Sequence, residues 1–277
     1  MTVELGRFGV WHQWHKWTPE LAQGLEQLGY GTFWLGSSPT ADLQAAENLL
    51  KATNSVVIGT SIVNMWTSNP AEVAASYHRL VDAYPNRFIL GVGIGHPEQS
   101  AVYSSPYDKV IEYLDALDEG KVPVAGRLLA ALGPKVLKVA AERTAGAIPY
   151  LTTPEHTREA RELMGPNALL APEHKVVLET DDDIARSIGR PYVEKPYLGL
   201  TNYRKNLRRI GYAQHDIDNG GSDRLIDELV LHGSAVEISD GLTAHLEAGA
   251  DHVVIQQLGH TDLDLLPGYE ALATVLF

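Results

Sequence analysis

The sequence predicts an α/β fold, a TIM (β/α)8 barrel, because eight short apolar stretches alternate with helix-forming stretches along its 277 residues. The length suits one such barrel. A doubly wound open sheet is the competing prediction. No Gly-x-Gly-x-x-Gly turn opens a helix, which weakens that alternative. No repeat or linker divides the chain, so we expect a single barrel domain over residues 1–277.

The expected strands are short apolar runs, each followed by turn or loop residues. The third, SVVIGTSIV, is apolar almost throughout, which is typical of strands that are buried on both faces of a parallel sheet. In chain order we place the strands at Arg7–Trp11, Thr32–Leu35, Ser55–Val63, Asn86–Pro97 with its loop, Arg127–Leu132, Gly146–Leu151, Lys175–Glu179 and His252–Gln256.

Helix starts lie between these strands and carry recognisable caps. Thr18, Asn69 and Thr153 each precede a proline, the arrangement of an N-cap residue followed by proline in the first helical position. Gly133-Pro134 begins a further helix. Residues 181–233 are expected to be mostly helical with a break at Asn219-Gly220-Gly221, so extra helices should separate strands seven and eight.

The stretch NRFILGVGIGHP, residues 86–97, has two contrasting faces. Side chains alternate along a strand, so Gly91, Gly93 and Gly95 share one face, and the bulky residues share the other. Glycines inside a strand mark the close approach of a backbone or a ligand. Tight packing against another element and a ligand cavity are both open on these residues alone.

Composition excludes several classes of function. The formal net charge is −13, which opposes binding to nucleic acids and to anionic membranes. No cysteine is present, so disulfides, zinc-thiolate sites and cysteine nucleophiles are excluded. No apolar run approaches the roughly 18 residues of a membrane span, and the N-terminus lacks a signal-peptide pattern. We therefore expect a cytoplasmic protein.

Active sites of such barrels lie where the strands end. The residues that follow the expected strands are rich in aromatic rings and imidazoles and poor in carboxylates, which suits a large ring held by stacking and hydrogen bonds. They are His12, Trp14, His15, Ser37, Asn64, Trp66, His96, Gly133, Tyr150, Thr152, Thr153 and His156.

Two further features of these loops bear on ligands. The helix starts at Gly133 and Thr153 present free backbone N–H groups that can bind phosphate. His12 and His15 have no evident third partner, whereas a catalytic zinc usually has three protein ligands, so we predict no metal site. Trp14 and its neighbours have a simpler interpretation as caps on the barrel mouth.

Residues 59–97, GTSIVNMWTSNPAEVAASYHRLVDAYPNRFILGVGIGHP, resemble the signature region of the bacterial luciferase-like monooxygenase superfamily. Residues 129–157 resemble its next block. The last stretch, from NYRKNLRRIGY to LEAGADHVVIQ, resembles an actinobacterial and mycobacterial branch described as probable F420-dependent oxidoreductases.

The resemblance implies a flavin or deazaflavin across the carboxyl-terminal mouth of the barrel. Gly93 and Gly95 would leave room for its ring, and a non-prolyl cis bond at Ser61–Ile62 would lie behind it. Backbone N–H groups near Leu132 and Gly133 would bind its phosphate. The full set of cofactor-binding residues predicted in this way is Ser61, Ile62, Asn64, Gly93, Gly95, Leu132, Gly133, Thr152 and Thr153.

On this basis we expect an oxidoreductase that transfers hydride between the deazaflavin F420 and an unidentified small organic substrate. His96 or His12 would act as acid or base, because imidazole titrates near neutral pH. Ser37 and Asn64 would orient the substrate. Relatives often carry a histidine after strand two, where this chain has Gly36-Ser37.

Two alternatives stay open. One is an FMN-dependent monooxygenase of the same superfamily, and the other is a non-catalytic barrel that binds a cofactor or ligand. Members of the family are often dimeric, and the apolar residues of helix Asn69–Tyr84 are consistent with a homodimer.

Overall fold

Parallel strands form one curled sheet at the centre of the protein. The computed structural model describes residues 3–95, 105–259 and 264–277. The strands are β1 (Phe8–Gln13), β2 (Thr32–Gly36), β3 (Val57–Ser61), β4 (Val63–Asn64), β5 (Phe88–Gly93), β6 (Arg127–Leu129), β7 (Gly146–Ala147), β8 (Leu169–Leu170), β9 (Glu173–Val177), β10 (Val230–His232) and β11 (Val253–Gln257).

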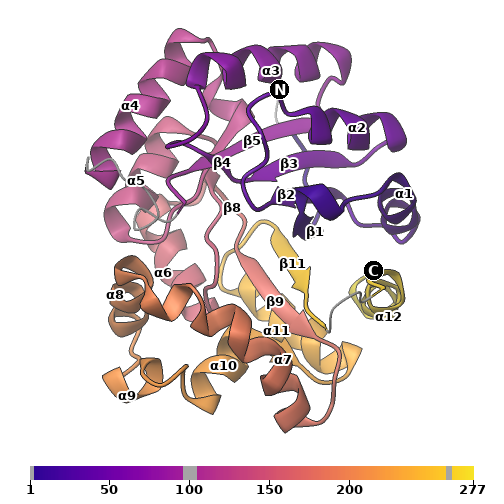
Figure 1. Cartoon of the computed structure of the whole chain (residues 1–277), viewed down its shortest axis with the longest axis vertical. Coiled ribbons are helices and arrows are strands. Elements are labelled where there is room, and N and C mark those ends of the chain that lie inside the picture. The colour runs from indigo at the N-terminus through magenta and orange to yellow at the C-terminus, as the bar shows by residue number, and fades with distance from the viewer. Residues whose placement is uncertain (1–2, 96–104, 260–263) are drawn as a thin grey trace.

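The sheet runs in the order β10-β9-β11-β1-β2-β3-β5-β6-β7-β8, and β4 pairs with β5. Only two residues separate β8 from β9, so this one segment of chain joins both ends of the path. Ala171 N donates to Ala147 O on one side of the segment, and Val254 N donates to Pro172 O on the other, each at 2.9 Å. The sheet therefore curls into the predicted TIM barrel (Figure 1).

Helices cover the outside of the sheet, and the expected caps are present. The side chains of Thr18, Asn69 and Thr153 accept backbone N–H groups at the starts of α1, α3 and α6. The helices are α1 (Pro19–Gln27), α2 (Gln44–Ala52), α3 (Pro70–Ala83), α4 (Pro106–Glu119), α5 (Pro134–Arg143), α6 (Pro154–Met164), α7 (Asp182–Glu194), α8 (Thr201–Arg209), α9 (Gln214–Ile217), α10 (Asp223–Leu229), α11 (Ala235–Glu247) and α12 (Leu266–Leu276).

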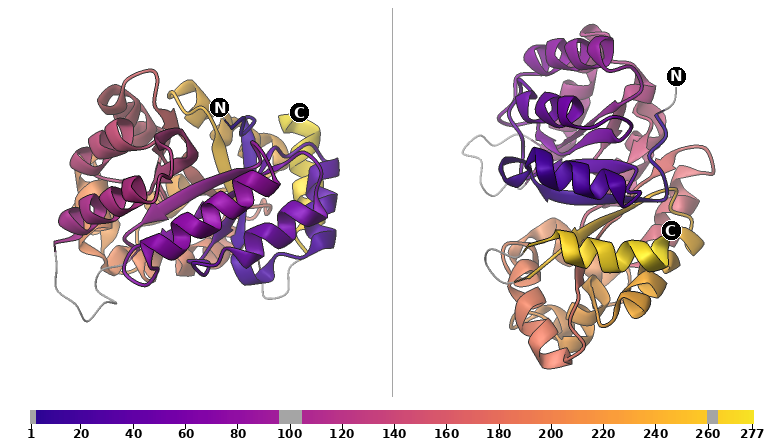
Figure 2. Two further views of the ribbon diagram at one scale, coloured as in Figure 1. Left: turned by 90° about the horizontal axis from the view of Figure 1, so that it is seen from above. Right: turned by 90° about the vertical axis from the view of Figure 1, so that its right-hand side faces the viewer.

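The arrangement brings the first and the last helix of the chain together. The final helix, α12, lies beside α1 at the edge of the molecule (Figure 2). The segment between β9 and β11 contains α7 to α11, which confirms the extra helices expected between strands seven and eight. None of the described helices combines the length and the hydropathy needed to cross a bilayer.

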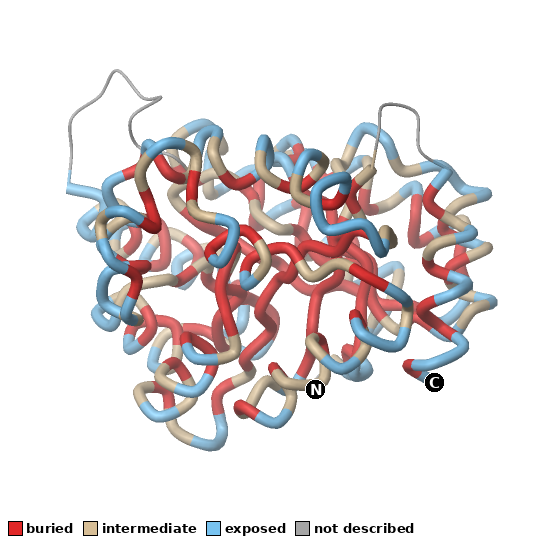
Figure 3. The backbone as a smooth tube through the Cα atoms, turned by 90° about the horizontal axis from the view of Figure 1, so that it is seen from below, coloured by how far each residue is buried: buried red, intermediate tan, exposed pale blue. Residues whose placement is uncertain are grey.

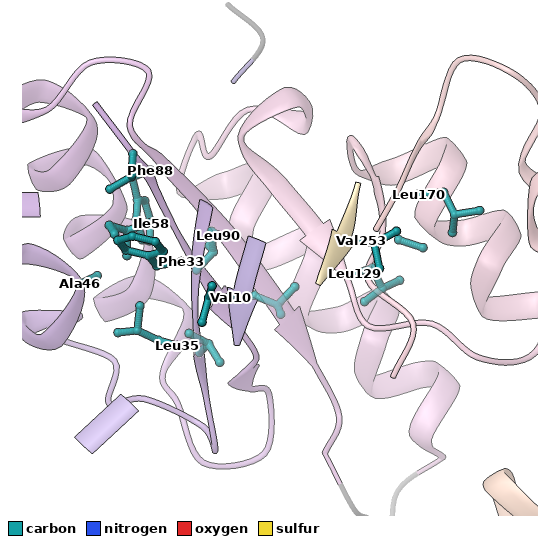
Figure 4. Close-up of a cluster of buried hydrophobic side chains, with 14 of the residues drawn as sticks. Val10, Phe33, Leu35, Ala46, Ile58, Phe88, Leu90, Leu129, Leu170 and Val253 are labelled. Carbon is teal, nitrogen blue, oxygen red and sulfur yellow. The ribbon is translucent and has the colours of Figure 1, made fainter. Parts of the chain in front are cut away.

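Side-chain alternation divides the core into two parts. Outward-facing residues such as Val10, Phe33 and Leu90 pack beneath the helices (Figure 4). Inward-facing residues such as Trp11 and Trp34 fill the barrel interior. The strands are accordingly the most buried part of the backbone (Figure 3). This confirms the prediction of strands covered on both faces.

Several strand assignments made from the sequence differ from the structure. The fifth strand ends at Leu129 and not at Leu132, and Leu169–Leu170 forms β8, which was not predicted. The seventh strand begins at Glu173, two residues earlier than predicted, and the sixth extends only to Ala147 because Pro149 follows. Val230–His232 forms β10 within the stretch expected to be mostly helical. No turn residue separates α10 from β10, so the local sequence lacks the usual boundary; pairing with β9 makes this stretch extended.

The glycine face of β5 is filled by the protein itself. A Cβ atom on Gly91 would lie 1.9 Å from the Thr60 carbonyl oxygen, and one on Gly93 would lie 2.7 Å from the Ala130 Cβ and 3.1 Å from Ile62 Cγ1. The space beside these two glycines is occupied by the neighbouring strands, which leaves no room there for a ligand. The expectation that Gly93 leaves room for a cofactor ring was therefore wrong, and the tight-packing alternative applies.

A buried histidine lies low in the barrel interior. His252 Nδ1 donates to Gly6 O at 2.8 Å, and Trp34 Nε1 donates to His252 Nε2 at 3.1 Å. One nitrogen donates and the other accepts, so the ring is neutral. Burial lowers the pKa of His252 from its ordinary 6.5 to about 4.

We predict that Gly91→Ala lowers the free energy of unfolding by about 1–3 kcal/mol, because the added methyl group overlaps the Thr60 carbonyl. Gly199→Ala is the matched control, since a Cβ there meets no atom within 4 Å. Urea unfolding of both variants measures the difference. Equal stability of the two variants would contradict the packing assigned to Gly91.

We also predict that acid destabilises the protein partly through His252. Between pH 6.5 and about 4 the unfolded chain binds a proton that the folded imidazole does not, so stability falls as pH falls through this window. Each pKa unit contributes about 1.4 kcal/mol. In urea unfolding at several pH values, His252→Gln should flatten this dependence, whereas replacement of the exposed His215 by Gln should not. Parallel pH profiles for His252→Gln and the unaltered protein would refute the assignment.

Candidate functional site

A cavity of about 850 Å³ opens where the strands end at their carboxyl termini. Its wall includes Trp11 at the end of β1, Ser37 after β2, and Asn64 in β4. Residues of α4, α5 and α8 complete it. The cavity thus occupies the place that barrel topology assigns to an active site.

Seven of the predicted site residues line this cavity. They lie at or after the ends of four neighbouring strands, β2, β3, β5 and β6, so the order of the sheet brings them together. They are Ser37, Ser61, Ile62, Asn64, Gly95, Leu132 and Gly133.

The backbone is unusual where the cavity meets β2 and β3. The Ser61–Ile62 bond is a non-prolyl cis peptide, as the sequence resemblance implied. Ser37 and Ser38 have φ angles of 62° and 55°. A left-handed conformation costs a residue other than glycine about 1 kcal/mol or more, and such residues cluster at ligand sites. Both serines line the cavity.

Other predicted residues lie off the cavity wall. Thr153 is buried, and its hydroxyl accepts the His156 N–H as the cap of α6. The Thr152 hydroxyl is also buried and has no hydrogen-bond partner among the described residues. Gly93 contacts only protein atoms, as described above. His96 lies outside the described residues.

His12 is directed away from the cavity. Trp11 faces inward, so His12, the next residue of the strand, faces outward and stacks edge-on against Trp17 at 5.9 Å. Burial, with smaller effects from Lys16 and His15, lowers the pKa of His12 to about 4. The ring is neutral at pH 7. The prediction that placed His12 at the reacting centre is corrected by this alternation.

The charge of the cavity is opposite to that of the chain. Lys135 near the start of α5, together with Lys205 and Arg209 of α8, lines the wall. No aspartate or glutamate stands among the described lining residues, although the whole chain carries a net charge of −13. Arg209 Nη2 donates to Asn206 Oδ1 at 2.6 Å, and its Nη1 forms an ion pair with Glu159, so Lys135 and Lys205 are the lining cations without a carboxylate partner among the described residues. The cavity is therefore suited to an anionic ligand.

These cationic residues were missed from the sequence. The segment 196–209 was assigned only to extra helices, yet Asn202, Asn206 and Arg209 of α8 reach the cavity. Their spacing of four and three residues places them on one helix face, which is the signal that could have identified them. Lys135 follows the predicted Gly133-Pro134 helix start by one residue.

A row of aromatic rings forms one wall. The ring centroids of Trp11 and Tyr150 are 6.0 Å apart, those of Tyr150 and Tyr197 are 5.4 Å apart, and those of Tyr197 and Tyr203 are 4.9 Å apart. Burial raises the pKa of Tyr150 well above its ordinary value, so its phenol is protonated at pH 7. That hydroxyl donates to Gln256 Oε1 at 2.9 Å. The cavity can thus hold a planar ring against aromatic faces.

A buried imidazole holds the loop that carries the predicted phosphate contacts. His156 Nε2 donates to Leu132 O at 2.8 Å, so its Nδ1 is unprotonated in the neutral ring. Burial lowers the pKa of His156 to about 4. The bond ties the start of α5 to α6, and it positions the backbone of Leu132 and Gly133 at the cavity.

Comparison with known proteins agrees with this geometry. Residues 15–121 match the model of the luciferase-like monooxygenase family. A curated relative, the uncharacterized protein YceB of Bacillus subtilis strain 168, is 35% identical over 81 residues. That match covers 27% of this chain and spans about a quarter, 24%, of the relative.

Solved structures share the whole fold. An F420-dependent secondary alcohol dehydrogenase in complex with an F420-acetone adduct has a TM-score of 0.74 at 15% identity, covering 99% of this chain and 98% of that one. The F420-dependent tetrahydromethanopterin reductase of Methanopyrus kandleri has a TM-score of 0.71 at 16% identity, with coverages of 100% and 99%.

A flavin enzyme is similar to this chain as well. The oxygenating constituent of 3,6-diketocamphane monooxygenase from Pseudomonas putida, in complex with FMN, has a TM-score of 0.67 at 14% identity and covers 97% of this chain and 96% of that one. At these identities the likeness to solved structures concerns the fold. The luciferase-like monooxygenase model matches residues 15–121, and the solved structures share the fold over nearly the whole chain.

Proposed function

We propose that this protein is an oxidoreductase that binds the deazaflavin F420 in the cavity and exchanges hydride with a small organic substrate. The observation that carries the proposal is the cavity's charge: Lys135 and Lys205 line it without a carboxylate partner among the described residues, Arg209 lines it paired with Glu159, and no described carboxylate lies in the wall of this acidic chain. F420 and FMN are both anionic through a phosphate and both carry a large planar ring. The cationic and aromatic parts of the wall fit those two features.

The residues present fit such a cofactor in three ways. The backbone at Leu132 and Gly133, at the N-terminus of α5, can bind the phosphate, since free N–H groups and the helix dipole favour an anion there. Lys135 adds charge at the same helix start. The cis segment Ser61–Ile62 and the Tyr150 wall can hold the ring.

The cofactor would supply the hydride chemistry, and the chain would bind, orient and exclude water. Ser37 and Asn64 carry hydrogen-bonding groups in a part of the wall without charged side chains among its described residues, which suits orientation of a substrate. Asn64 Oδ1 accepts from Trp66 N at 2.9 Å, so the amide is held in place. His96 remains our proposed acid or base.

FMN is the second candidate, because a similar structure contains it and the same wall would bind its phosphate. Titration of the purified protein with F420 and, separately, with FMN tests both, with ligand fluorescence as the readout. Micromolar binding of F420 with hydride exchange supports the proposal. Binding of FMN with turnover of reduced FMN and oxygen would replace it by the monooxygenase. Cofactor binding without turnover would favour a binding barrel.

We predict that Lys135→Gln weakens binding of the anionic cofactor about two- to fivefold at low ionic strength, because an exposed charge near a helix start contributes a fraction of a kcal/mol to about 1 kcal/mol. The effect should shrink in high salt. Lys138→Gln is the matched control, since Lys138 lies on the same helix but outside the cavity wall. Equal losses in both variants would contradict a local anion site.

A further inference from the structure

A buried ion pair lies inside the barrel directly below the cavity. Lys175 Nζ is 3.1 Å from Glu173 Oε1 and 3.2 Å from Oε2, and their side chains are 1% and 0% exposed. Both residues belong to β9, where the register places them beside Val254 and Gln256 of β11 on the inward face. Nothing in the proposed chemistry requires either charge.

The pair contacts the loop that carries the aromatic wall. Lys175 Nζ lies 3.8 Å from the centroid of the Tyr150 ring. Glu173 Oε2 accepts the backbone N–H of Leu151 at 3.1 Å. The ammonium therefore contacts the ring of one residue, and the carboxylate binds the backbone of the next.

Tyr150 is also held at its edge and on its sides. Its hydroxyl donates to Gln256 Oε1, and Trp11 and Tyr197 flank its ring. Tyr150 itself lines the cavity, whereas Glu173 and Lys175 do not. Among the described residues, the ion pair thus reaches the cavity mainly through Tyr150 and, at a longer distance, through Tyr197, whose ring centroid lies 5.7 Å from Lys175 Nζ.

Stability alone does not account for two charges in this place. Desolvating a carboxylate and an ammonium costs several kcal/mol for each ion, and apolar residues of similar volume are often as stabilising as the pair. A cation at the centre of an aromatic face, however, restricts where the ring can lie, which a methylene group does not. The ion pair is therefore better explained by its effect on the orientation of the Tyr150 ring than by a contribution to the free energy of folding.

We propose that Glu173 and Lys175 are positioning residues that fix the Tyr150 ring as a rigid wall, against which the planar ring of the bound cofactor packs. The identity of that ligand rests on the proposed function. A preorganised wall improves affinity because no ordering of Tyr150 is needed when the ligand binds.

The test uses the double variant Glu173→Gln/Lys175→Met, which removes both charges while nearly conserving volume. It should unfold at a temperature no lower than the unaltered protein and yet bind F420, or FMN if that is the ligand, about tenfold more weakly, a change of about 1.4 kcal/mol. In the ligand-free protein its near-ultraviolet circular dichroism should be weaker, because a mobile Tyr150 loses its fixed geometry relative to Trp11 and Tyr197.

Two further measurements keep the result interpretable. The double variant Arg186→Gln/Asp227→Asn removes an ion pair between α7 and α10, remote from the cavity wall, and should change neither signal. Tyr150→Leu removes the ring itself and should bind as weakly as the charge-free variant. Undiminished binding by Tyr150→Leu would refute the positioning role even if the charge-free variant fails to fold.

The outcomes separate this inference from the proposed function. If the unaltered protein binds F420 or FMN and either the charge-free variant or Tyr150→Leu binds it equally well, the positioning role is refuted and the function stands. If the unaltered protein binds neither, the function is refuted, and the ligand-free circular dichroism decides the positioning role. An unchanged spectrum in a folded charge-free variant overturns it.

Discussion

Closure of the barrel by the segment from β8 to β9 is the constraint on which the rest of the structure depends. Backbone hydrogen bonds from this segment reach β7 on one side and β11 on the other. The same segment carries the buried ion pair on its inward face. Strand pairing sets the loops after β2, β3, β5 and β6 side by side, and the segment after β7 and helix α8 complete the wall of the cavity.

The side chains inside the barrel differ in charge and accessibility from its bottom to its mouth. Near the bottom, His252 is neutral and uses both ring nitrogens, one with Trp34 and one with a backbone carbonyl. Towards the mouth, the interior holds the Glu173–Lys175 pair and then the aromatic wall. The polar group near the bottom is neutral, the next pair is charged and buried, and the aromatic wall above them is accessible from the cavity. In this arrangement a rigid interior supports a site whose outer parts come from loops and from α8.

The glycines of β5 show how one pattern can have two causes. Gly91 and Gly93 are bare because the cis segment after β3 and the strand beside it press against them. Their role for a ligand is indirect: they allow Ile62 to lie where the resemblance places it behind the cofactor ring. Gly95 differs, since it has a positive φ, contacts Asn64 and lines the cavity.

Sequence alone determined the fold class, the order of most strands, the helix caps and the approximate location of the site. These features follow from local periodicity, from capping chemistry and from the rule that barrel loops after strands form the mouth. The short β10 and the early start of β9 could not be predicted from the sequence, because pairing with distant strands makes those residues extended. The cis peptide bond at Ser61–Ile62 was predicted from the family resemblance and not from periodicity.

Only the tertiary structure decided which loop residues meet. His12 was excluded because a strand turns successive side chains to opposite faces, and the position of Trp11 decides which face is inward. Lys205 and Arg209 lie more than 60 residues beyond Lys135 along the chain, so their common cavity depends on the path of α7 and α8 over the barrel mouth. Composition showed that the chain is acidic. That three of its 22 Lys and Arg residues line one cavity without a carboxylate beside them in the described wall is a property of the structure, because charge distribution depends on distances in space and not along the sequence.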